Sequence, residues 1–237
     1  GRNAVLEAFR SGKTVDRLFV LDGCQDGPVK TILREAKKQD TMVQYVKKER
    51  LDQLSETKNH QGVIAYCAAC EYAEVSDILE NAKKKGEAPF IVLLDGIEDP
   101  HNLGAIIRTA NQAGAHGVII PKRRAVGLTA TVARTSAGAV NYTPVAKVTN
   151  LVTVMEDLKK EGMWFVCADM DGEEMYSLNL KGPIGLVIGN EGEGVSRLVK
   201  EHCDMVASIP MKGDIDSLNA SVAMGVLAYE IVRQRRF

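Results

Sequence analysis

An asparagine and an arginine stand six residues apart in the segment LLDGIEDPHNLGAIIRTA, residues 93–110. The segment has the pattern of a buried strand, a polar loop and a helix that begins close to Asn102, a residue type that caps helices well. Side chains lean toward the helix N-terminus, so Arg108 is expected to reach back over Gly104 toward Asn102. A guanidinium and a carboxamide at the carboxyl end of a strand would form a polar ligand site. An arginine that bonds a neighbouring loop explains the pattern equally well.

A glycine-rich loop lies in GLVIGNEGEGVSRLV, residues 185–199. A buried strand ends at Gly189, and a loop with Gly192 and Gly194 leads into a helix. Glycines let a backbone approach a ligand closely. The spacing matches neither the dinucleotide-binding pattern nor the phosphate-loop pattern, and no lysine stands where a phosphate loop needs one. A nucleoside triphosphate site is therefore disfavoured, whereas a ligand loop and a simple strand–helix turn both fit.

The third segment is SIPMKGDIDSLNASVAMGVLAYEIV, residues 208–232. A strand ends at Ile209, and Ser217 is the expected N-cap of the final helix. Small residues in the first two turns of that helix allow another backbone to approach closely. Tight packing explains the small residues, but it does not explain the polar Ser217 and Asn219 at the helix entrance.

Strand-like and helix-like segments alternate along the chain, which predicts an α/β protein. Residues 1–75 should form a small α/β unit. We expect a linker at 76–89, which begins as a helix and contains a solvated lysine run at 83–85. From Phe90 onward, short continuous apolar runs predict parallel strands that helices cover on both faces, in a second domain over 90–237.

The composition limits the classes of partner. The 237 residues carry a net charge of −1 and are 5% aromatic, so a surface built mainly on stacked aromatic rings is not expected. A nucleic-acid surface would then be a local patch, such as the basic cluster Lys122, Arg123 and Arg124.

No apolar run approaches the roughly 20 residues of a membrane span, so no membrane partner is expected. Five cysteines, an odd number without regular spacing, indicate reduced thiols and a cytoplasmic protein.

The sequence does not predict a metal site. Cys67 and Cys70 have the spacing of a zinc or redox pair, but they fall in a predicted strand, where residues three apart face opposite sides. No second pair accompanies them, and the four histidines show no ligand spacing.

The three polar segments, in this order, resemble the three motifs of the SpoU (TrmH-type) RNA ribose 2′-O-methyltransferases of the SPOUT superfamily. The matching residues are NLGAIIRTA at 102–110, VIGNEGEG at 187–194 and IPMKGDIDSLNASVA at 209–223. The resemblance covers about residues 90–237. HQGVIA at 60–65, with the unit before it, is similar to the family's substrate-binding domain. This pairing most resembles the RlmB-like branch, which methylates guanosine in large-subunit (23S) rRNA.

The resemblance implies a C-terminal parallel-sheet domain with a deep trefoil knot and a small N-terminal substrate-binding domain of ribosomal-protein-like fold. It also implies S-adenosylmethionine as the cofactor, RNA as the substrate and a homodimer. The positions that match the family's cofactor contacts are Gly189, Asn190, Ile209, Met211 and Leu218.

Arg108 matches the family's catalytic arginine. Because a guanidinium stays protonated, we expect it to stabilise the developing alkoxide of the ribose rather than to act as a base. Asn102, Glu191, Ser217 and Asn219 match the other polar motif positions. We expect these four to position the substrate and the loops.

Other functions fit parts of the sequence. A tRNA ribose methyltransferase would use the same motifs. A non-catalytic RNA-binding or ribosome-assembly protein could retain the fold, although the intact motifs argue against it. A Rossmann nucleotide enzyme is disfavoured because LLDGIEDPHN holds no glycine fingerprint.

Asp216, just before Ser217, is less usual for the third motif and could tune its loop.

Overall fold

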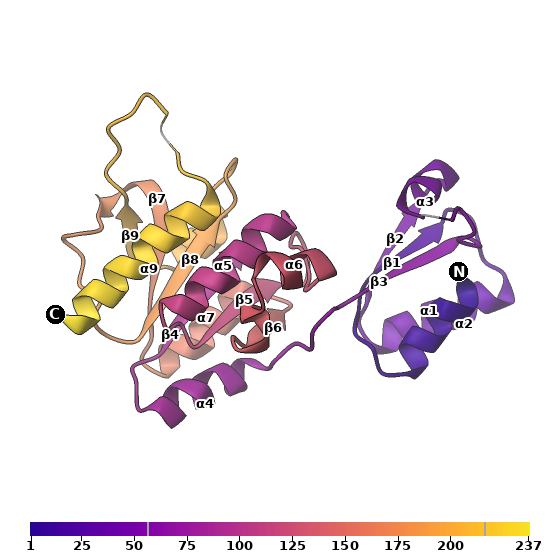
Figure 1. Cartoon of the computed structure of the whole chain (residues 1–237), viewed down its shortest axis with the longest axis horizontal. Helices are drawn as coiled ribbons and strands as arrows, with labels where there is room; N and C mark the ends of the chain where they lie inside the picture. The colour runs from indigo at the N-terminus through magenta and orange to yellow at the C-terminus, as the bar shows by residue number, and fades with distance from the viewer. Residues whose placement is uncertain (56, 216) are drawn as a thin grey trace. The chain divides into compact units, whose positions relative to one another are not determined.

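The computed structural model describes residues 1–55, 57–215 and 217–237, so Asp216 lies outside the described residues. The chain divides into two compact units (Figure 1). Unit 1 comprises Gly1–Glu71 and Gly127–Ala130, and unit 2 comprises Tyr72–Val126 and Thr131–Phe237.

Unit 1 is a small α/β unit. Its elements are α1 (Arg2–Arg10), β1 (Val15–Leu21), α2 (Gly27–Lys38), β2 (Met42–Val46), α3 (Lys48–Leu54) and β3 (Val63–Cys67). The strands form one sheet in the order β2-β1-β3, in which β1 is parallel to β2 and antiparallel to β3. Leu18 and Val20 of β1 pack with Val5 and Phe9 of α1 in a buried core. Successive side chains of a strand point to opposite faces of the sheet, so Leu18 and Val20 of β1 lie on the same face, the one that α1 covers.

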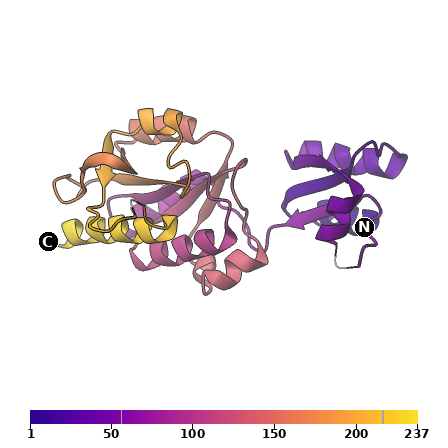
Figure 2. The same cartoon turned by 90° about the horizontal axis from the view of Figure 1, so that it is seen from above.

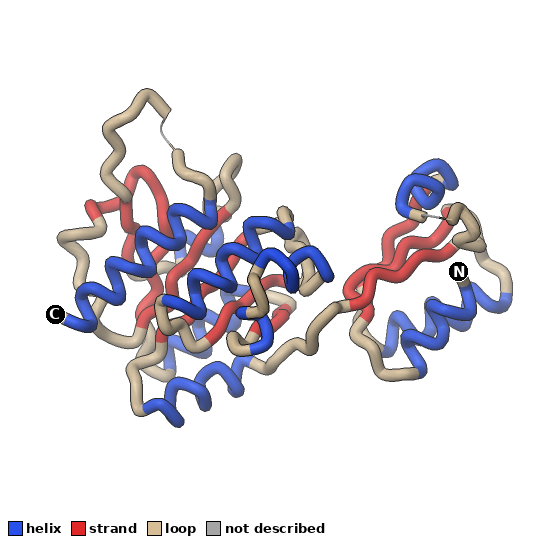
Figure 3. The backbone as a smooth tube through the Cα atoms, in the orientation of Figure 1, coloured by secondary structure: helices blue, strands red, loops and turns tan. Residues whose placement is uncertain are grey.

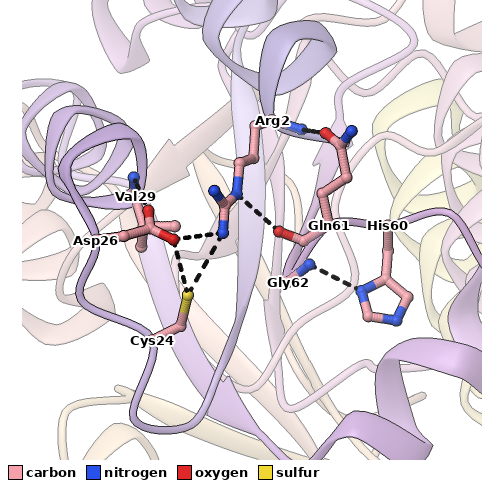
Figure 4. A network of polar contacts seen from close by, with 7 residues as sticks. All are labelled: Arg2, Cys24, Asp26, Val29, His60, Gln61 and Gly62. Atoms are coloured by element: carbon pink, nitrogen blue, oxygen red, sulfur yellow. Dashed lines mark hydrogen bonds and ion pairs between the residues drawn. The ribbon is translucent and has the colours of Figure 1, made fainter.

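The residues His60–Gly62 form a turn before β3 (Figure 4). Nδ1 of His60 accepts a hydrogen bond from the Gly62 N–H at 3.0 Å. The carbonyl oxygen of Gln61 accepts one from Nε of Arg2 at 2.9 Å, and Arg2 also pairs with Asp26, the N-cap of α2. Gln61 has φ of 53°, a left-handed conformation that few non-glycine residues adopt. The turn thus ties α1 to the start of α2.

Unit 2 holds a six-stranded sheet in the order β6-β5-β4-β8-β7-β9, and every neighbouring pair is parallel. The strands are β4 (Phe90–Asp95), β5 (Gly117–Pro121), β6 (Val145–Val148), β7 (Trp164–Glu174), β8 (Ile184–Gly189) and β9 (Met205–Ser208). Central strands β4 and β8 are buried along their whole length, as the continuous apolar runs predict. The predicted parallel-sheet α/β fold is confirmed.

Helices cover both faces of this sheet (Figures 2 and 3). They are α4 (Val75–Lys85), α5 (Pro100–Gln112), α6 (Ala130–Thr135), α7 (Leu151–Lys160), α8 (Arg197–Glu201) and α9 (Ala220–Arg236), with a 3₁₀ turn, η1, at Ala139–Asn141. In Figure 2 the yellow α9 lies below the sheet and the orange α8 above it. Residues of α4, α7 and α8 share one buried cluster with Ile91 and Leu93 of β4. Gly225 of α9 faces Thr109 of α5, so these two helices pack together on the other face.

The stretch 76–89, expected as a linker, is largely occupied by α4. Ile78 is fully buried and packs against the sheet core of unit 2, and Gly86 ends the helix in a left-handed conformation. The chain passes from unit 1 to unit 2 between Glu71 and Tyr72. In the sequence, this amphipathic stretch runs into three lysines and so resembles a linker. The packing of Ile78 against the sheet is what assigns the helix to unit 2.

Two helix starts differ from the predictions. Asp99 caps α5, because its carboxylate accepts a hydrogen bond from the His101 N–H at 2.9 Å, and Asn102 lies buried inside the helix. Asn219, not Ser217, caps α9 by accepting from the N–H groups of Ser221 and Val222. Each predicted cap is a suitable residue type two or three positions from the actual cap.

No helix among the described residues is long and apolar enough to cross a membrane. All five cysteines are free thiols, and Cys70 lies after β3 rather than within it. The described part of the chain contains no group of three His, Cys, Asp or Glu side chains that could hold a metal ion.

Candidate active site

A cavity of about 250 Å³ opens at the carboxyl ends of β8 and β9. This edge is where parallel sheets usually bind ligands. Four segments form its walls: the middle of β7, the loop after β8, the loop after β9 and the start of α9. Seven of the predicted site residues line it: Gly189, Asn190, Glu191, Ile209, Met211, Ser217 and Leu218.

Gly189 allows the chain to fold back on itself at the cavity wall. A Cβ atom at this position would overlap the backbone of Gly194 and Val195. No flexible side chain could move aside to relieve that overlap. The close approach of two backbone segments is therefore the physical reason for glycine at the end of β8.

The loop that follows β8 is held by its own asparagine. Oδ1 of Asn190 accepts hydrogen bonds from the N–H groups of Gly192 at 2.9 Å and Glu193 at 2.7 Å. Gly194 takes a φ of 67° and donates its N–H to the Asn190 carbonyl at 3.0 Å. Next to the loop, the buried carboxylate of Asp95 accepts from the Ser196 N–H at 2.8 Å. The loop is thus fixed by hydrogen bonds within the chain itself.

One carboxylate oxygen joins all three sequence motifs. Oε1 of Glu191 accepts hydrogen bonds from Nδ2 of Asn102, from Nδ2 of Asn219 at 2.9 Å and from the Ala220 N–H at 3.3 Å. Nδ2 of Asn219 also donates to Oδ1 of Asn102 at 2.9 Å. Residues up to 117 positions apart therefore meet beside the cavity, at the entrance of α9. This arrangement explains Asn219, one of the two polar residues at the helix entrance that tight packing leaves unexplained.

Arg108 does not join this cluster. It is exposed, it does not line the cavity, and none of the described residues gives it a hydrogen bond or an ion pair. Successive helical residues turn by about 100°, so a residue six positions from the buried Asn102 points about 120° away from it. Gly104, expected to make room for Arg108, instead lies buried against Thr135 of α6. The prediction that Arg108 reaches over Gly104 toward Asn102 is wrong for the single chain.

Asp169 of β7 also lines the cavity, although it is not among the predicted site residues. Its carboxylate pairs with Nζ of Lys200 at 2.7 Å. Burial alone would raise the pKa of Asp169, but the hydrogen bonds from Lys200 and the Asp171 N–H hold that pKa below its usual value. The carboxylate therefore stays charged at neutral pH. The signal in the sequence is its place at the end of the run MWFVCAD, on the same sheet edge as Gly189.

A second cavity of about 480 Å³ shares Asn190, Glu191, Glu193 and Gly194 with the first. Its other walls include Asp95, Glu98, Asp99 and Arg124. Arg124 is exposed and has φ of 52°, whereas Arg123 is exposed and lines neither cavity. Lys122 is half-buried, and its N–H donates to the Val148 carbonyl at 2.8 Å. Of the predicted basic cluster, only Arg124 is placed beside the motif loops.

The sequence matches two family descriptions over separate parts of the chain. Residues 89–229 match the SpoU rRNA Methylase family, and residues 1–73 match the RNA 2′-O ribose methyltransferase substrate-binding family. The chain belongs to the SpoU rRNA methylase family. A Bacillus subtilis protein described as a TrmH family tRNA/rRNA methyltransferase is 49% identical, over 99% of this chain and 94% of that protein. A Staphylococcus haemolyticus protein of the same description is 46% identical, over 99% of this chain and 94% of that protein.

Solved structures of the same family share the fold. The SpoU methyltransferase AviRb of Streptomyces viridochromogenes, in complex with AdoMet, superposes with a TM-score of 0.64 at 27% identity, over 100% of this chain and 89% of that one. An AdoMet-bound rRNA methyltransferase from Sinorhizobium meliloti has a TM-score of 0.63 at 25% identity, over 98% and 85% of the two chains.

Membership settles several expectations from the sequence. The chain is an RNA methyltransferase, its cofactor is S-adenosylmethionine, and the deep trefoil knot is a feature that the family implies. The chemistry of the first cavity fits this cofactor. Backbone N–H and C=O groups of the loops can bond polar groups of the adenosyl and methionyl parts, and Met170, Ile188 and Leu218 supply apolar walls.

Proposed function

We propose that this chain methylates the ribose 2′-hydroxyl of a guanosine in large-subunit rRNA. The observation that supports the reaction is the meeting of the three motifs at Glu191, beside a cavity that fits the cofactor. The match of residues 1–73 to a substrate-binding family supports recognition of a structured RNA by a dedicated unit. The relatives described as tRNA/rRNA methyltransferases leave the type of RNA to experiment.

In this proposal the first cavity holds S-adenosylmethionine. Gly189, Ile209 and Leu218 bind it through backbone groups, with Asn190 and Met211 nearby. The cofactor supplies a methyl group that is activated by a positively charged sulfur. Asn102, Glu191 and Asn219 keep the loops around the cavity in place, and Ser217 at its wall orients the substrate.

Arg108 stabilises the negative charge that develops on the ribose oxygen as the hydroxyl proton leaves. A sugar hydroxyl is a poor nucleophile at neutral pH, and a fixed cation beside it lowers the cost of forming an alkoxide. The exposed guanidinium can also bind an RNA phosphate through two parallel hydrogen bonds and so orient the ribose. Its lack of a partner among the described residues supports a role toward a group outside this chain.

We propose that the enzyme acts as a homodimer through the face formed by α5 and α9. Val222 and Tyr229 are exposed on α9, and the half-buried Val226 lies between them on the same side of the helix. A second copy over this apolar row would remove it from water. Arg108 directly precedes Thr109, which faces α9, so this contact would bring Arg108 to the subunit interface.

The second cavity is the proposed place of the target nucleotide. Arg124 at its wall suits a phosphate group. The exposed carboxylate of Glu98 has no partner among the described residues, and two adjacent N–H donors on the guanine edge match the two oxygens of a carboxylate. This fit supports guanosine as the target.

The test is methyl transfer from labelled S-adenosylmethionine to purified rRNA and tRNA, followed by alkaline hydrolysis and mapping. We expect label at one alkali-resistant guanosine of large-subunit rRNA. Label on tRNA only would keep the chemistry and overturn the substrate. Cofactor binding without label on either RNA would indicate that the substrate is a different RNA or an assembled particle. Neither label nor cofactor binding would favour a non-catalytic RNA-binding protein.

A further inference from the structure

Exposed cations gather at the edge of the six-stranded sheet opposite the cofactor cavity, where the strands begin. Three lysines end α4, two arginines lie in the last turn of α9, and one lysine precedes β8. We call these six residues the amino-edge patch: Lys83, Lys84, Lys85, Lys181, Arg233 and Arg236, all exposed.

A seventh cation, Arg235, holds the three segments of the patch together. Its Nη1 donates to the Ala88 carbonyl at 3.0 Å, and its Nη2 donates to the carbonyls of Pro89 at 2.9 Å and Gly182 at 2.7 Å. These bonds fix the end of α9 against the loop after α4 and against the loop that contains Lys181. The guanidinium also lies 5.4 Å from the centre of the Phe90 ring. The patch is therefore a fixed surface, although its members come from distant parts of the chain.

The positive charge of the patch is only partly balanced. Lys84 pairs with Glu80 at 3.0 Å, and Arg233 pairs with Glu230 at 2.7 Å. In the part of the chain that the structure describes, the other four cations have no acidic partner: Lys83, Lys85, Lys181 and Arg236. Neighbouring like charges repel one another, so folding alone does not favour this arrangement. Although the net charge of the whole chain is only −1, these four unpaired cations lie together at the amino edge of the sheet.

We propose that the amino-edge patch binds the sugar–phosphate backbone of the RNA substrate at a distance from the methylated ribose. The proposal rests on the RNA methyl transfer proposed above. The central strands are six residues long, so patch and cavity lie about 20 Å apart, which one folded RNA easily spans. Tyr176 and Phe237 are exposed and line a shallow pocket with Lys181 and Arg233, so aromatic faces stand beside the cations as in other RNA-binding grooves.

The test compares two double variants that remove the same net charge from unit 2. Lys85→Gln with Lys181→Gln changes the patch, and Lys160→Gln with Arg197→Gln changes exposed cations that already pair with Asp157 and Glu201 on the helices α7 and α8. The probe is the RNA that accepts label from the wild type. Its Kd is measured between about 50 and 200 mM salt, together with kcat at saturating RNA and the Kd for S-adenosylmethionine.

We expect the patch variant to bind this RNA roughly tenfold more weakly and to lower the slope of log Kd against log salt by about 2, one for each phosphate contact. Its kcat and its affinity for S-adenosylmethionine should match the wild type, and the control variant should match throughout. An unchanged Kd and salt slope for the patch variant would overturn the proposal. If the wild type labels no RNA, the proposed function fails, and this inference fails with it.

Discussion

The two edges of the six-stranded sheet in unit 2 use charge in opposite ways. At the carboxyl edge, Glu191 takes three donors from the other two motifs, and its neighbour Asn190 fixes a glycine loop. At the amino edge, Arg235 donates to three backbone carbonyls, and among the described residues only two of the six exposed cations near it, Lys84 and Arg233, pair with acids. The first edge presents backbone groups and carboxylates around cavities. The second presents positive charge on an open surface.

This difference shows that the net charge of the chain does not reveal where its charged surfaces lie. A net charge of −1 gives no global sign of a polyanion partner, yet six exposed cations gather at the amino edge, away from the carboxylate-lined cavities. The comparison also assigns different consequences to the two edges. Changes at the carboxyl edge should alter cofactor binding and catalysis, whereas changes to Arg235 at the amino edge should alter stability and leave cofactor binding intact.

The largest effect is expected for Gly189→Ala at the carboxyl edge. Its Cβ would overlap the backbone of Gly194, so the loop must move out of its place at the cavity wall. Overpacking of this kind costs about 3 kcal/mol or more, which corresponds to at least a 100-fold loss of S-adenosylmethionine affinity by calorimetry. Gly192→Ala is the control, because its Cβ would meet only Oδ1 of Asn190 at an ordinary 3.6 Å. Equal affinities of the two variants for S-adenosylmethionine would show that the close backbone approach at Gly189 is not needed for cofactor binding.

A smaller loss is expected for Glu191→Gln. The amide keeps an acceptor oxygen but removes the charge that strengthens the bonds from Asn102, Asn219 and Ala220. We expect kcat/KM for methyl transfer to fall about 10- to 100-fold. Glu193→Gln, an exposed neighbour whose side chain has no partner among the described residues, should stay within about twofold of the wild type. Equal losses would show that loop charge, and not the joint between the motifs, matters.

Arg235→Gln tests the other edge. It removes three hydrogen bonds from a half-buried guanidinium to backbone carbonyls, so we expect the free energy of unfolding to fall by about 2–3 kcal/mol. Arg236→Gln, the exposed neighbour, should change it by less than about 0.5 kcal/mol in the same denaturant titration. The affinity of both folded variants for S-adenosylmethionine should equal that of the wild type. A loss of affinity in Arg235→Gln would break the proposed separation of the two edges.

The smallest effect concerns His116, also near the amino edge. Nδ1 of this buried ring accepts from the Phe90 N–H at 3.0 Å, and Nε2 contacts Glu87 at 3.0 Å. Burial lowers the pKa of His116 below its usual 6.5, and the contact with Glu87 offsets this only in part. The unfolded chain therefore takes up a proton at a higher pH than the folded one. This contribution to stability is present above about pH 6.5 and is lost as the pH falls through the folded-state pKa, at most about 1.4 kcal/mol per pH unit.

The check is the free energy of unfolding measured between about pH 5 and 8. His116→Asn keeps an oxygen that can accept from Phe90 and should show a shallower slope below pH 6.5 than the wild type. A slope unchanged in His116→Asn would contradict the proposed neutral, buried state.

The sequence could predict much of this structure because its local signals agree with one another. The alternating strand-like and helix-like segments predict the observed α/β fold, and seven predicted site residues line one cavity, because ordered motif matches fix which loops meet at a sheet edge. Helix starts are less certain: Asp99, Asn102, Ser217 and Asn219 are all suitable caps, and only the fold selects Asp99 and Asn219.

Other features depend on contacts that no local pattern encodes. The lysine run at 83–85 is exposed, as predicted, but no local pattern shows that Arg235 ties the end of α9 to the loop after α4 and to the loop that contains Lys181. The α4 segment looks like a linker until Ile78 is seen packed against the sheet. The direction of Arg108 was wrongly predicted, because the N-cap of α5 lies three residues earlier than expected and Thr135 fills the space beside Gly104.

The most direct test of the central claim is methyl transfer by Arg108→Ala, with Gln112→Ala, one helical turn further along the exposed side of α5, as the control. Label from S-adenosylmethionine is counted on RNA under single-turnover conditions, and cofactor affinity is measured in parallel. If Arg108 stabilises the alkoxide, Arg108→Ala should lose about 100- to 1,000-fold in rate at unchanged cofactor affinity, while Gln112→Ala keeps the wild-type rate. An Arg108→Ala enzyme that transfers methyl groups at the wild-type rate would contradict the account.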